Sequence, residues 1–361
     1  MDPKEKISQC LSMYTPNDTQ PMIDKSIEIS VKGKWMTVPA LDVNGATIIV
    51  KKKLVRLAVI EGEEWLESEL EDPELCVRKL KERPHGLRAD IFTFAQKLPG
   101  TSPKYKYLME HDSVAAIHLT TFNEWWEKLP QESRKNVRRS QKRGVVVTVR
   151  QLDDELIEGI VGVNNDSPVR QGRRYSHYGK TFEQVKKDQL SFLDRSDFIC
   201  AYLGDELIGF MKIVYRGEVA SILQMLPKAS HQDKRPANAL VARAVELCET
   251  RGISYLTYGL FNYGKKRDNS LRDFKIRNGF QEMLTPRFYV PLTIWGSLSL
   301  KLKIHRGIIG ILPHSVIRLA VGARAKWYNR MQSTSRCSSM LERSTCNRQM
   351  GGSNPPAGSN P

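Results

Sequence analysis

Three β-rich segments in close succession, followed by a long helix and one more strand, constrain the fold of this chain most. The segments cover residues 198–203, 207–215 and 219–226. Short turns containing Gly204 and Gly217 separate them, so they predict an antiparallel meander. A helix is predicted over 236–251, because proline stands at its first position and glycine follows its last. A buried strand over 253–258 then completes a parallel crossover.

The elements around this meander extend the pattern in both directions. Those expected within the same unit are a strand at 145–149, helices at 153–163, 182–193 and 270–277, and a strand at 288–292. The resulting order over 144–292, β-α-α-β-β-β-α-β-α-β, predicts a mixed α/β sandwich. Earlier in the chain the expected elements are strands at 27–35, 54–60, 89–95 and 113–121 and a helix at 73–80.

Three stretches together resemble a known family. They are the basic helix expected at 133–145, the loop and helix from Arg235 to Gly252, and Phe274-Lys-Ile-Arg-Asn-Gly-Phe280. Their order and spacing resemble the FemAB-like branch of the GNAT N-acyltransferases, in which two GNAT-type halves stand in tandem. The resemblance covers 131–292 well, and over 44–122 it rests only on the alternation of strands and helices.

The resemblance implies an α/β fold of two GNAT-like mixed-sheet halves in tandem, the second better defined, plus basic C-terminal helices. The expected parts are an N-terminal extension (1–43), a degenerate N-terminal half (44–130), a catalytic C-terminal half (131–292), a basic amphipathic helical extension (293–330) and a disordered tail (331–361). The tail repeats Gly-Ser-Asn-Pro at 352 and 358. This tetrapeptide can be encoded by a sequence that resembles the T-arm of a tRNA gene read in frame, which would explain at most one copy, so we hypothesise an aberrant coding end.

The start of the helix at 236–251 is a candidate carrier site. A helix N-terminus presents free N–H groups and the positive end of a dipole, which suit a phosphate. The candidate cofactor-binding residues are Lys234, Arg235, Ala237 and Asn238. The alternative is an ordinary surface helix. Because the loop at 228–235 has no glycine, the anionic carrier stays open between acyl-CoA and aminoacyl-tRNA.

The loop at 164–180 concentrates guanidinium groups and aromatic rings, a combination typical of a lid over an anionic substrate. Its candidate substrate-binding residues are Arg170, Arg173, Tyr175 and Tyr178. His177 is the candidate general base, because the pKa of an unperturbed histidine lies near neutrality. The alternatives are a basic surface loop and a structural histidine.

Three further candidates come from the end of the catalytic half. The resemblance implies that Lys275 lies near the substrate, with an ordinary exposed lysine as the alternative. Tyr258 and Asn262 follow the parallel strand at 253–258, and ligands gather at the carboxyl ends of such strands. Tyr258 is a candidate acid for the leaving thiolate or hydroxyl, or else a buried strand residue. Asn262 is a candidate substrate-binding residue.

The location of charge separates the classes of partner. The chain carries 56 Lys and Arg against 40 Asp and Glu, a net charge of +16. The stretch 132–144 holds six basic residues and one acidic residue, whereas 293–330 holds seven basic residues, interleaved Leu and Ile, and no acidic residue. The second composition is typical of an anchor on an anionic membrane surface, with helices packed on the catalytic half as the alternative.

Other features indicate a compartment. No apolar run reaches the length of a membrane span, and the polar first residues do not form a signal peptide. Six cysteines without a Cys-x-x-Cys pair predict reduced thiols and no metal site. We therefore expect a cytoplasmic protein that is peripheral on the inner face of the membrane.

The leading hypothesis is an N-acyltransferase. It moves an acyl or aminoacyl group from a CoA or tRNA carrier to an amine acceptor on a cell-envelope or sugar-linked substrate. One alternative is a non-catalytic RNA-binding protein that contacts phosphates through 134–143 and 170–180, with tRNA as partner. Another is a peripheral membrane scaffold on the same fold.

Overall fold

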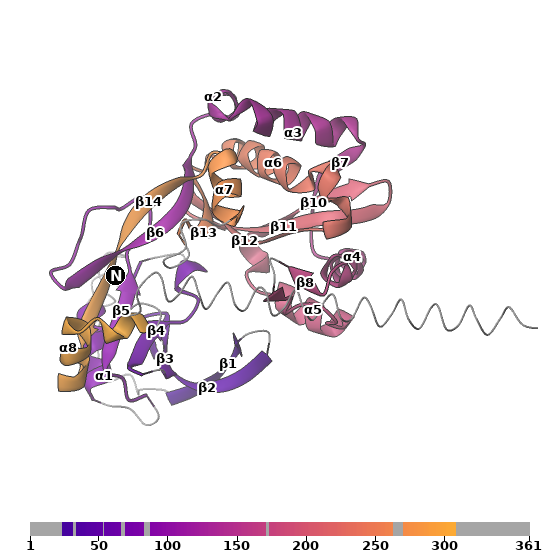
Figure 1. The fold of residues 1–361 in the computed structure, drawn as a ribbon. Coiled ribbons are helices and arrows are strands. Elements are labelled where there is room, and N and C mark those ends of the chain that lie inside the picture. Colours follow the sequence, from indigo (N-terminus) through magenta and orange to yellow (C-terminus); the bar gives the residue numbers. More distant parts are fainter. Residues whose placement is uncertain are drawn as a thin grey trace, which may run out of the picture.

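The computed structural model describes residues 24–31, 34–52, 54–65, 69–82, 87–170, 173–262 and 270–307. Within them, a twelve-stranded mixed sheet runs through the molecule (Figure 1). Its strands, in chain order, are β1 (Asp24–Val31), β2 (Lys34–Val43), β3 (Ala46–Lys52), β4 (Arg56–Ile60), β5 (Ile91–Ala95), β6 (Leu108–His118), β7 (Val145–Arg150), β10 (Ser196–Leu203), β11 (Glu206–Arg216), β12 (Val219–Pro227), β13 (Tyr255–Leu260) and β14 (Gln281–Pro291). A separate two-stranded ribbon joins β8 (Val169–Arg170) to β9 (Arg173–Arg174).

Helices cover both faces of the second half of the sheet. The helices of the described residues are α1 (Pro73–Lys81), α2 (Phe122–Lys128), α3 (Gln131–Lys142), α4 (Asp154–Asn165), α5 (Phe182–Gln189), α6 (Pro236–Thr250), α7 (Ser270–Arg277) and α8 (Ile294–Lys301). Short 3-10 turns are η1 (Glu63–Trp65), η2 (Leu193–Arg195), η3 (Ala229–Lys234) and η4 (Ile304–Arg306). In Figure 1, α2, α3 and α6 lie above β10–β12, and α4 and α5 lie below. The predicted mixed α/β fold is confirmed.

The meander forms because β11 alternates between two cores. Ile213 packs with Leu240 of α6, and Phe210 packs with Ile160 of α4. Gly204 and Gly217 adopt the positive φ that the two turns require. α6 begins at Pro236 as predicted, and β13 pairs with β12 in parallel. The local signals in this half therefore agree with the structure.

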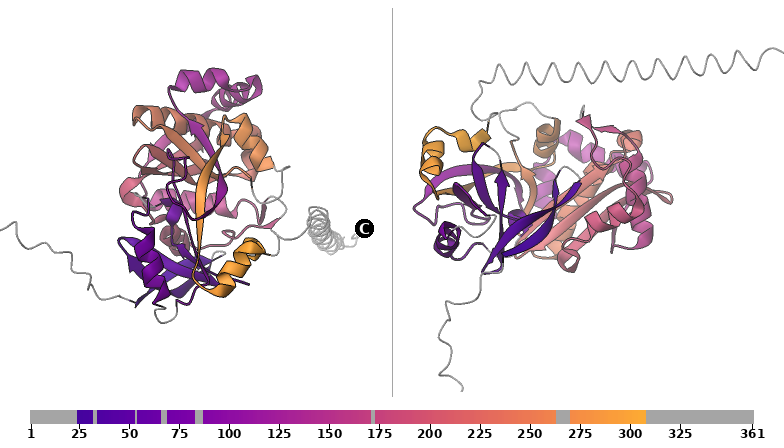
Figure 2. Two further views of the ribbon diagram at one scale, coloured as in Figure 1. Left: turned by 90° about the vertical axis from the view of Figure 1, so that its left-hand side faces the viewer. Right: turned by 90° about the horizontal axis from the view of Figure 1, so that it is seen from below.

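The first half repeats this arrangement in a smaller form. β2, β3 and β4 form an antiparallel meander, α1 follows, and β5 pairs with β4 in parallel. The second half has the corresponding series β10, β11, β12, α6 and β13. The two series stand at opposite ends of one continuous sheet (Figures 1 and 2).

Each half is completed by a strand from the other. The strand order through the centre is β5-β14-β6-β13, so β14 lies against β5 and β6 lies against β13. β14 and β6 also pair with each other, with Thr285 opposite Asp112. The carboxyl ends of β5 and β13 lie on opposite sides of this central pair, because Ala95 is paired with Arg287 of β14 and Leu260 with Val114 of β6. The expected boundaries at 43, 130 and 292 stay predictions.

Three local predictions were wrong. Instead of one strand at 27–35, residues 24–43 contain the antiparallel pair β1 and β2, in which Val31 lies opposite Lys34. β14 begins at Gln281 and not at 288, because Pro286 sits inside the strand opposite His111. The loop at 164–180 contains the short ribbon of β8 and β9.

The expected C-terminal helices are described only in part. α8 and η4 lie in 293–330, while residues 308–361, including the expected tail, lie outside the described residues. Among the described helices none has the length and hydropathy to cross a bilayer.

Candidate active site

The start of α6 groups three of the four predicted carrier-binding residues. Arg235 precedes the helix with a left-handed φ of 58°, and no side chain caps the first turn. Arg235 is exposed, and Lys234 and Ala237 are half-buried. Arg143, at the end of α3, donates to the carbonyl oxygen of Asp233 at 2.5 Å and adds a third cation. Uncapped N–H groups beside cations are suited to a phosphate.

Asn238, the fourth residue, holds elements of the fold together. Its side-chain amide is buried and donates to Oδ1 of Asn278 at 2.9 Å. Asn278 in turn donates to the carbonyl oxygen of Phe274, in α7, at 2.7 Å. Asn238 therefore fixes the start of α6 against the end of α7.

The loop at 164–180 lies at the carboxyl end of β12. The guanidinium of Arg170 donates to the carbonyl oxygens of Pro227 at 2.8 Å and Val163 at 3.1 Å. Its Cζ lies 5.0 Å from the centre of the Tyr175 ring. The Tyr175 hydroxyl donates to Oδ1 of Asn164 at 3.1 Å, and burial raises its pKa to about 12. These two side chains join the loop to α4 and β12.

The predicted base, His177, lies in the same loop beside an acid on α5. Its Nδ1 is 3.4 Å from Oδ2 of Asp188, which also accepts a hydrogen bond from Lys180 at 2.5 Å. Tyr178 is 45% exposed and is available at the surface. Arg173 lies in β9, and its side chain lies outside the described residues.

Lys275 and Tyr258 are brought together at the end of β13. The buried ammonium of Lys275 donates to the carbonyl oxygens of Tyr258 at 2.5 Å and Leu260 at 2.7 Å. Gly259, between them, has a φ of 54°, a backbone conformation that suits glycine. Burial lowers the pKa of Lys275 to about 8. Lys275 thus positions the end of β13, and the alternative of an ordinary exposed lysine is excluded.

Asn262 ties the end of β13 to its neighbours. Its side-chain amide donates to Glu282 at 2.7 Å and to the Ser113 hydroxyl at 3.3 Å, and its oxygen accepts from Arg272 at 3.1 Å. It thereby links β14, β6 and α7 just beyond Leu260.

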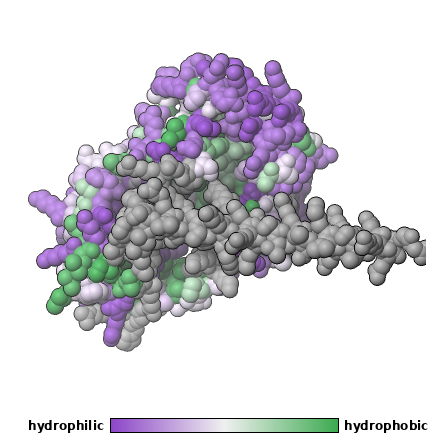
Figure 3. Space-filling view, in the orientation of Figure 1, coloured by the Kyte–Doolittle hydropathy of each residue, from purple (hydrophilic) through white to green (hydrophobic). Residues whose placement is uncertain are grey.

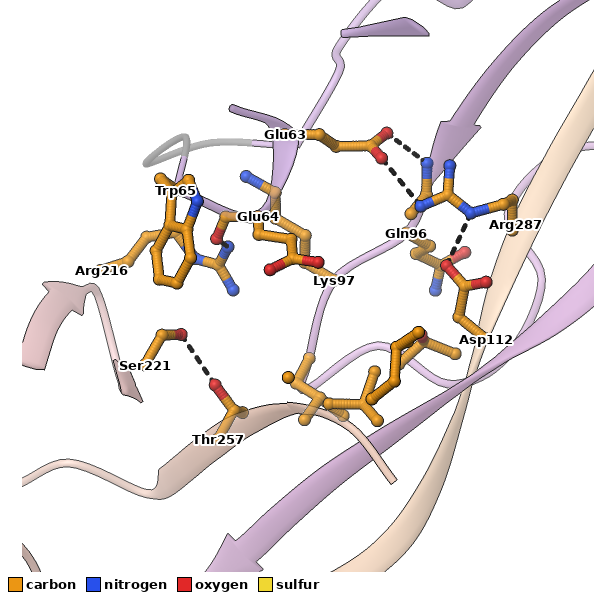
Figure 4. Close-up of a pocket in the computed structure, with 16 residues that line it drawn as sticks. Glu63, Glu64, Trp65, Gln96, Lys97, Asp112, Arg216, Ser221, Thr257 and Arg287 are labelled. Atoms are coloured by element: carbon orange, nitrogen blue, oxygen red, sulfur yellow. Dashed lines mark hydrogen bonds and ion pairs between the residues drawn. The ribbon is translucent and has the colours of Figure 1, made fainter. Parts of the chain in front are cut away.

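A cavity of about 100 Å³ opens beside this end of β13, in the centre of the sheet (Figure 4). It lies where the carboxyl ends of β5 and β13 approach the β6–β14 pair. Both halves line it: Glu63, Glu64, Trp65, Ala95, Gln96, Lys97, Leu98, Asp112, Val114, Arg216, Ser221, Thr257, Gly259, Leu260, Thr285 and Arg287. Direct pairing of β12 with β13 reaches only from Val219 to Ser221. The hydroxyls of Ser221 and Thr257, 2.7 Å apart, mark where the two strands diverge.

The cavity contains ionisable groups whose pKa values are shifted toward neutrality. Burial lowers the pKa of Lys97 to about 7, and the nearby positive charge of Arg216 acts in the same direction. Burial raises the pKa of Glu64 and lowers that of Arg216. An amine and a carboxyl group perturbed in opposite directions in one cavity are typical of an acid–base site.

An ion-paired arginine forms one wall. Arg287 donates through Nε to Asp112 at 2.6 Å and through Nη2 to Glu63 at 2.9 Å. Glu63 also accepts from the backbone N–H of Ala95 at 2.6 Å. Figure 4 shows these groups on one side of the cavity, with Trp65 and Arg216 on the other. Arg216 donates to the carbonyl oxygen of Glu64 at 2.7 Å, so η1 is held to the second half.

Sequence reasoning missed this cavity, although one signal pointed to it. The rule that ligands gather at the carboxyl ends of parallel strands led to Tyr258 and Asn262 in the second half. Applied to the first half, the rule leads to Glu63 after β4 and Lys97 after β5. No local pattern indicates that both ends meet at one cavity.

The described residues contain no group of three or more His, Cys, Asp or Glu side chains placed to hold a metal ion. Cys76, Cys200 and Cys248 are buried free thiols, and burial raises the pKa of each to about 12.

Comparisons with known proteins find similarity in structure only. No protein-family model matches the chain, and a search of curated proteins finds no match. FemX is 12% identical, with a TM-score of 0.47 over 78% of this chain and 90% of FemX. The C-terminal domain of a putative lysylphosphatidylglycerol synthetase from Agrobacterium fabrum is 13% identical, with a TM-score of 0.49 over 73% of this chain and 87% of that domain.

A third similar structure has the tandem organisation in its name. It is a tandem GNAT protein from the clavulanic acid biosynthesis pathway, 10% identical, with a TM-score of 0.39 over 70% of this chain and 82% of that protein. The structures that this chain resembles thus include FemX and a tandem GNAT protein.

Proposed function

We propose that this protein is an N-acyltransferase whose reaction takes place in the cavity between the two halves. It transfers an acyl or aminoacyl group from an anionic carrier, acyl-CoA or aminoacyl-tRNA, to an amine. The acceptor class, an amine on a cell-envelope or sugar-linked molecule, enters the proposal from the sequence resemblance. One observation carries the proposal: a half-buried lysine, Lys97, with a pKa lowered to about 7 lines a cavity at the point where β12 and β13 diverge.

In the proposal, the carrier extends from the start of α6 to this cavity. From Ser221 to the end of β12 the chain extends roughly 20 Å at the usual rise per strand residue. In the proposal, the carrier phosphate lies at the first turn of α6, where Lys234 and Arg235 supply positive charge. Its extended arm follows the opening between β12 and β13 and delivers the acyl carbonyl to the cavity.

The cavity residues supply the proton transfer. An acceptor amine is protonated in water and must lose a proton before it attacks. In the proposal, Lys97 in its neutral form takes that proton. The amine nitrogen forms a bond to the acyl carbon, and the oxyanion lies near the Arg216 charge. The carbon–sulfur or carbon–oxygen bond to the carrier then breaks, and the leaving group takes up the second proton that the attacking nitrogen loses as the amide forms.

The test combines donor panels with a pH profile. Acyl-CoA and charged tRNA are supplied with amine acceptors, and product is followed by mass spectrometry. With the active pair, kcat/KM is expected to rise with pH through about 7, because the neutral form of Lys97 dominates above its pKa. Lys97→Met is expected to lower kcat roughly 100-fold or more and remove this limb of the profile.

Lys128→Met, on the exposed surface of α2, is the matched control and is expected to keep both the rate and the profile. An unchanged pH profile in Lys97→Met would contradict the assignment of the base. Failure of every donor to give product would contradict the enzyme itself.

RNA binding without catalysis is a second candidate, favoured by α3. Its outward side carries the exposed residues Lys135, Arg138 and Lys142, and Lys135 and Lys142 form no ion pair with a described residue. Phosphate contacts by such a face make affinity fall steeply with salt. A salt titration with bulk tRNA tests this binding, and dependence of product on the attached amino acid separates a tRNA-using enzyme from a passive binder.

A further inference from the structure

α8 is anchored to the first half by its inward side. The Thr293 hydroxyl caps the helix by accepting from the N–H of Gly296 at 3.0 Å. A Cβ at Gly296 would lie 1.9 Å from the carbonyl oxygen of Asp90, so the helix backbone touches the start of β5. Leu300 is buried with Val55 and Ile91. In Figures 1 and 2, α8 lies beside the strands of the first half.

The outward side of α8 is apolar. Ile294 is 91% exposed, Leu302 57%, and Trp295 and Leu298 45% each. At 100° per residue these four side chains fall within one sector of about 100°, opposite the buried side. Figure 3 shows hydrophobic surface in this region of the molecule. Isolated exposed apolar residues are ordinary, but a contiguous group on one helix face marks a contact surface.

Cations border this apolar face. Lys301 and Lys303 are exposed, and neither forms an ion pair with another described residue. The sequence continues the composition, because 293–330 contains seven basic residues and no acidic one. An apolar sector bordered by lysines is complementary to a bilayer surface that carries anionic headgroups.

We propose that the outer face of α8 docks on an anionic lipid surface. Ile294, Trp295 and Leu298 enter the boundary between headgroups and acyl chains, and Lys301 and Lys303 contact lipid phosphates. The helix then lies in the plane of the membrane, since its eight residues are too few to span it. This docking holds the first half of the sheet against the lipid. It is independent of the proposed reaction, because α8 lies outside the cavity lining.

The test measures flotation of the full chain with vesicles of phosphatidylcholine alone or mixed with phosphatidylglycerol. Binding is expected to favour the anionic vesicles at low salt. The combined variant Ile294→Gln, Trp295→Gln and Leu298→Gln is expected to lower partitioning roughly tenfold or more. The matched control is Val146→Gln with Leu190→Gln, which removes exposed apolar side chains elsewhere and is expected to leave partitioning unchanged. Thermal unfolding verifies that each variant is folded.

A charge variant tests the second part of the surface. Lys301→Gln with Lys303→Gln is expected to lower partitioning to anionic vesicles roughly tenfold and to reduce its salt dependence. Equal binding to neutral and anionic vesicles, or wild-type binding by the triple variant, overturns the proposal. So does a lipid-free wild-type dimer that the triple variant converts to a monomer, because the face then belongs to a second copy of this chain.

Discussion

Lys275 shows how one buried charge shapes the end of a strand. Its ammonium binds the two carbonyl oxygens on either side of Gly259, and Gly259 and Leu260 line the cavity. Burying this lysine lowers the free energy of unfolding, since burial of the charged form is unfavourable. The lowered pKa of about 8 corresponds to that cost, which can therefore be measured from the pH dependence of stability.

Stability is therefore expected to depend on pH through Lys275. Between about 8, its folded pKa, and 10.5, its ordinary value, the unfolded chain binds more protons than the folded one. The contribution of this group to stability thus rises with pH across that window, and below pH 8 its cost is fully present. Urea unfolding of wild type and Lys275→Met is expected to show that the unfolding free energy of wild type rises by up to roughly 3 kcal/mol relative to the variant as the pH increases across this window. Parallel curves would contradict the burial of the charge.

Arg287 differs from Lys275 because its charge is balanced by two carboxylates, so its removal is expected to lower stability. Arg287→Met leaves Glu63 and Asp112 without their partner at the wall of the cavity. These three side chains are partly buried, so the loss is expected to exceed that of a surface pair and to stay below the roughly 3–5 kcal/mol of a fully buried one, which urea unfolding will measure. Arg306→Met is the control, since it removes an arginine paired with Glu110 at the surface and is expected to cost less than about 1 kcal/mol. If Arg287→Met and Arg306→Met lowered the unfolding free energy equally, the ion pairs of Arg287 would be no stronger than a surface pair.

Individual site residues were only partly predictable from the sequence. Lys275 was found through its motif, but its contacts with the β13 carbonyls depend on how α7 packs. Arg170 was predicted to bind substrate, yet both ends of its guanidinium contact backbone carbonyls. A basic residue in a loop has the same local signature in either role. For Lys97 the sequence indicates only its place after β5, because its lowered pKa arises from burial between distant segments.

At the level of elements, the start of α6 combines strain with charge. Arg235 adopts φ 58°, which costs a residue with a Cβ roughly 1–2 kcal/mol relative to glycine. Arg235→Gly is expected to raise the unfolding free energy by at most about 1 kcal/mol, because the flexibility of glycine in the unfolded chain offsets part of the relief. If Arg235 binds the carrier, the same variant raises the KM for the donor several-fold.

Asn44→Gly provides the control for this variant. Asn44 also has a positive φ, of 47°, in the turn between β2 and β3. The Asn44→Gly variant is expected to raise the unfolding free energy by a similar amount and to leave the KM for the donor unchanged. A KM that moves equally in both variants would argue against carrier binding at α6.

Elements of the second half were predictable because their signals are local. Turn glycines, Pro236 and the nearly continuous apolar run of β11 each act within a few residues. The predicted strand at 288–292 missed the first seven residues of β14, which include Pro286, although proline is normally excluded from a central strand. Here its carbonyl oxygen accepts from the N–H of Gln96, and its missing N–H is tolerated inside the pairing with β6. Only the neighbouring strands make that arrangement possible.

For the whole molecule, the exchange of β6 and β14 predicts cooperative unfolding. Neither half has a complete sheet alone, since β5 needs β14 and β13 needs β6. Calorimetry is expected to give one transition, with equal calorimetric and van't Hoff enthalpies. Ile48→Val in the first half and Ile213→Val in the second are each expected to cost about 0.5–1.5 kcal/mol and to shift that same transition. Two separable transitions would show that the halves are independent domains.

The strand exchange also sets a schedule for synthesis. β5, with the sequence Ile-Phe-Thr-Phe-Ala, leaves the ribosome long before its partner β14 is made. At 5–20 residues per second the interval is roughly 10–40 s. During that time the nascent chain presents an unpaired apolar edge, the kind of surface that aggregates or recruits chaperones. The synthesis of β14 therefore determines when the exposed edge of β5 is covered and the first half can no longer aggregate through it.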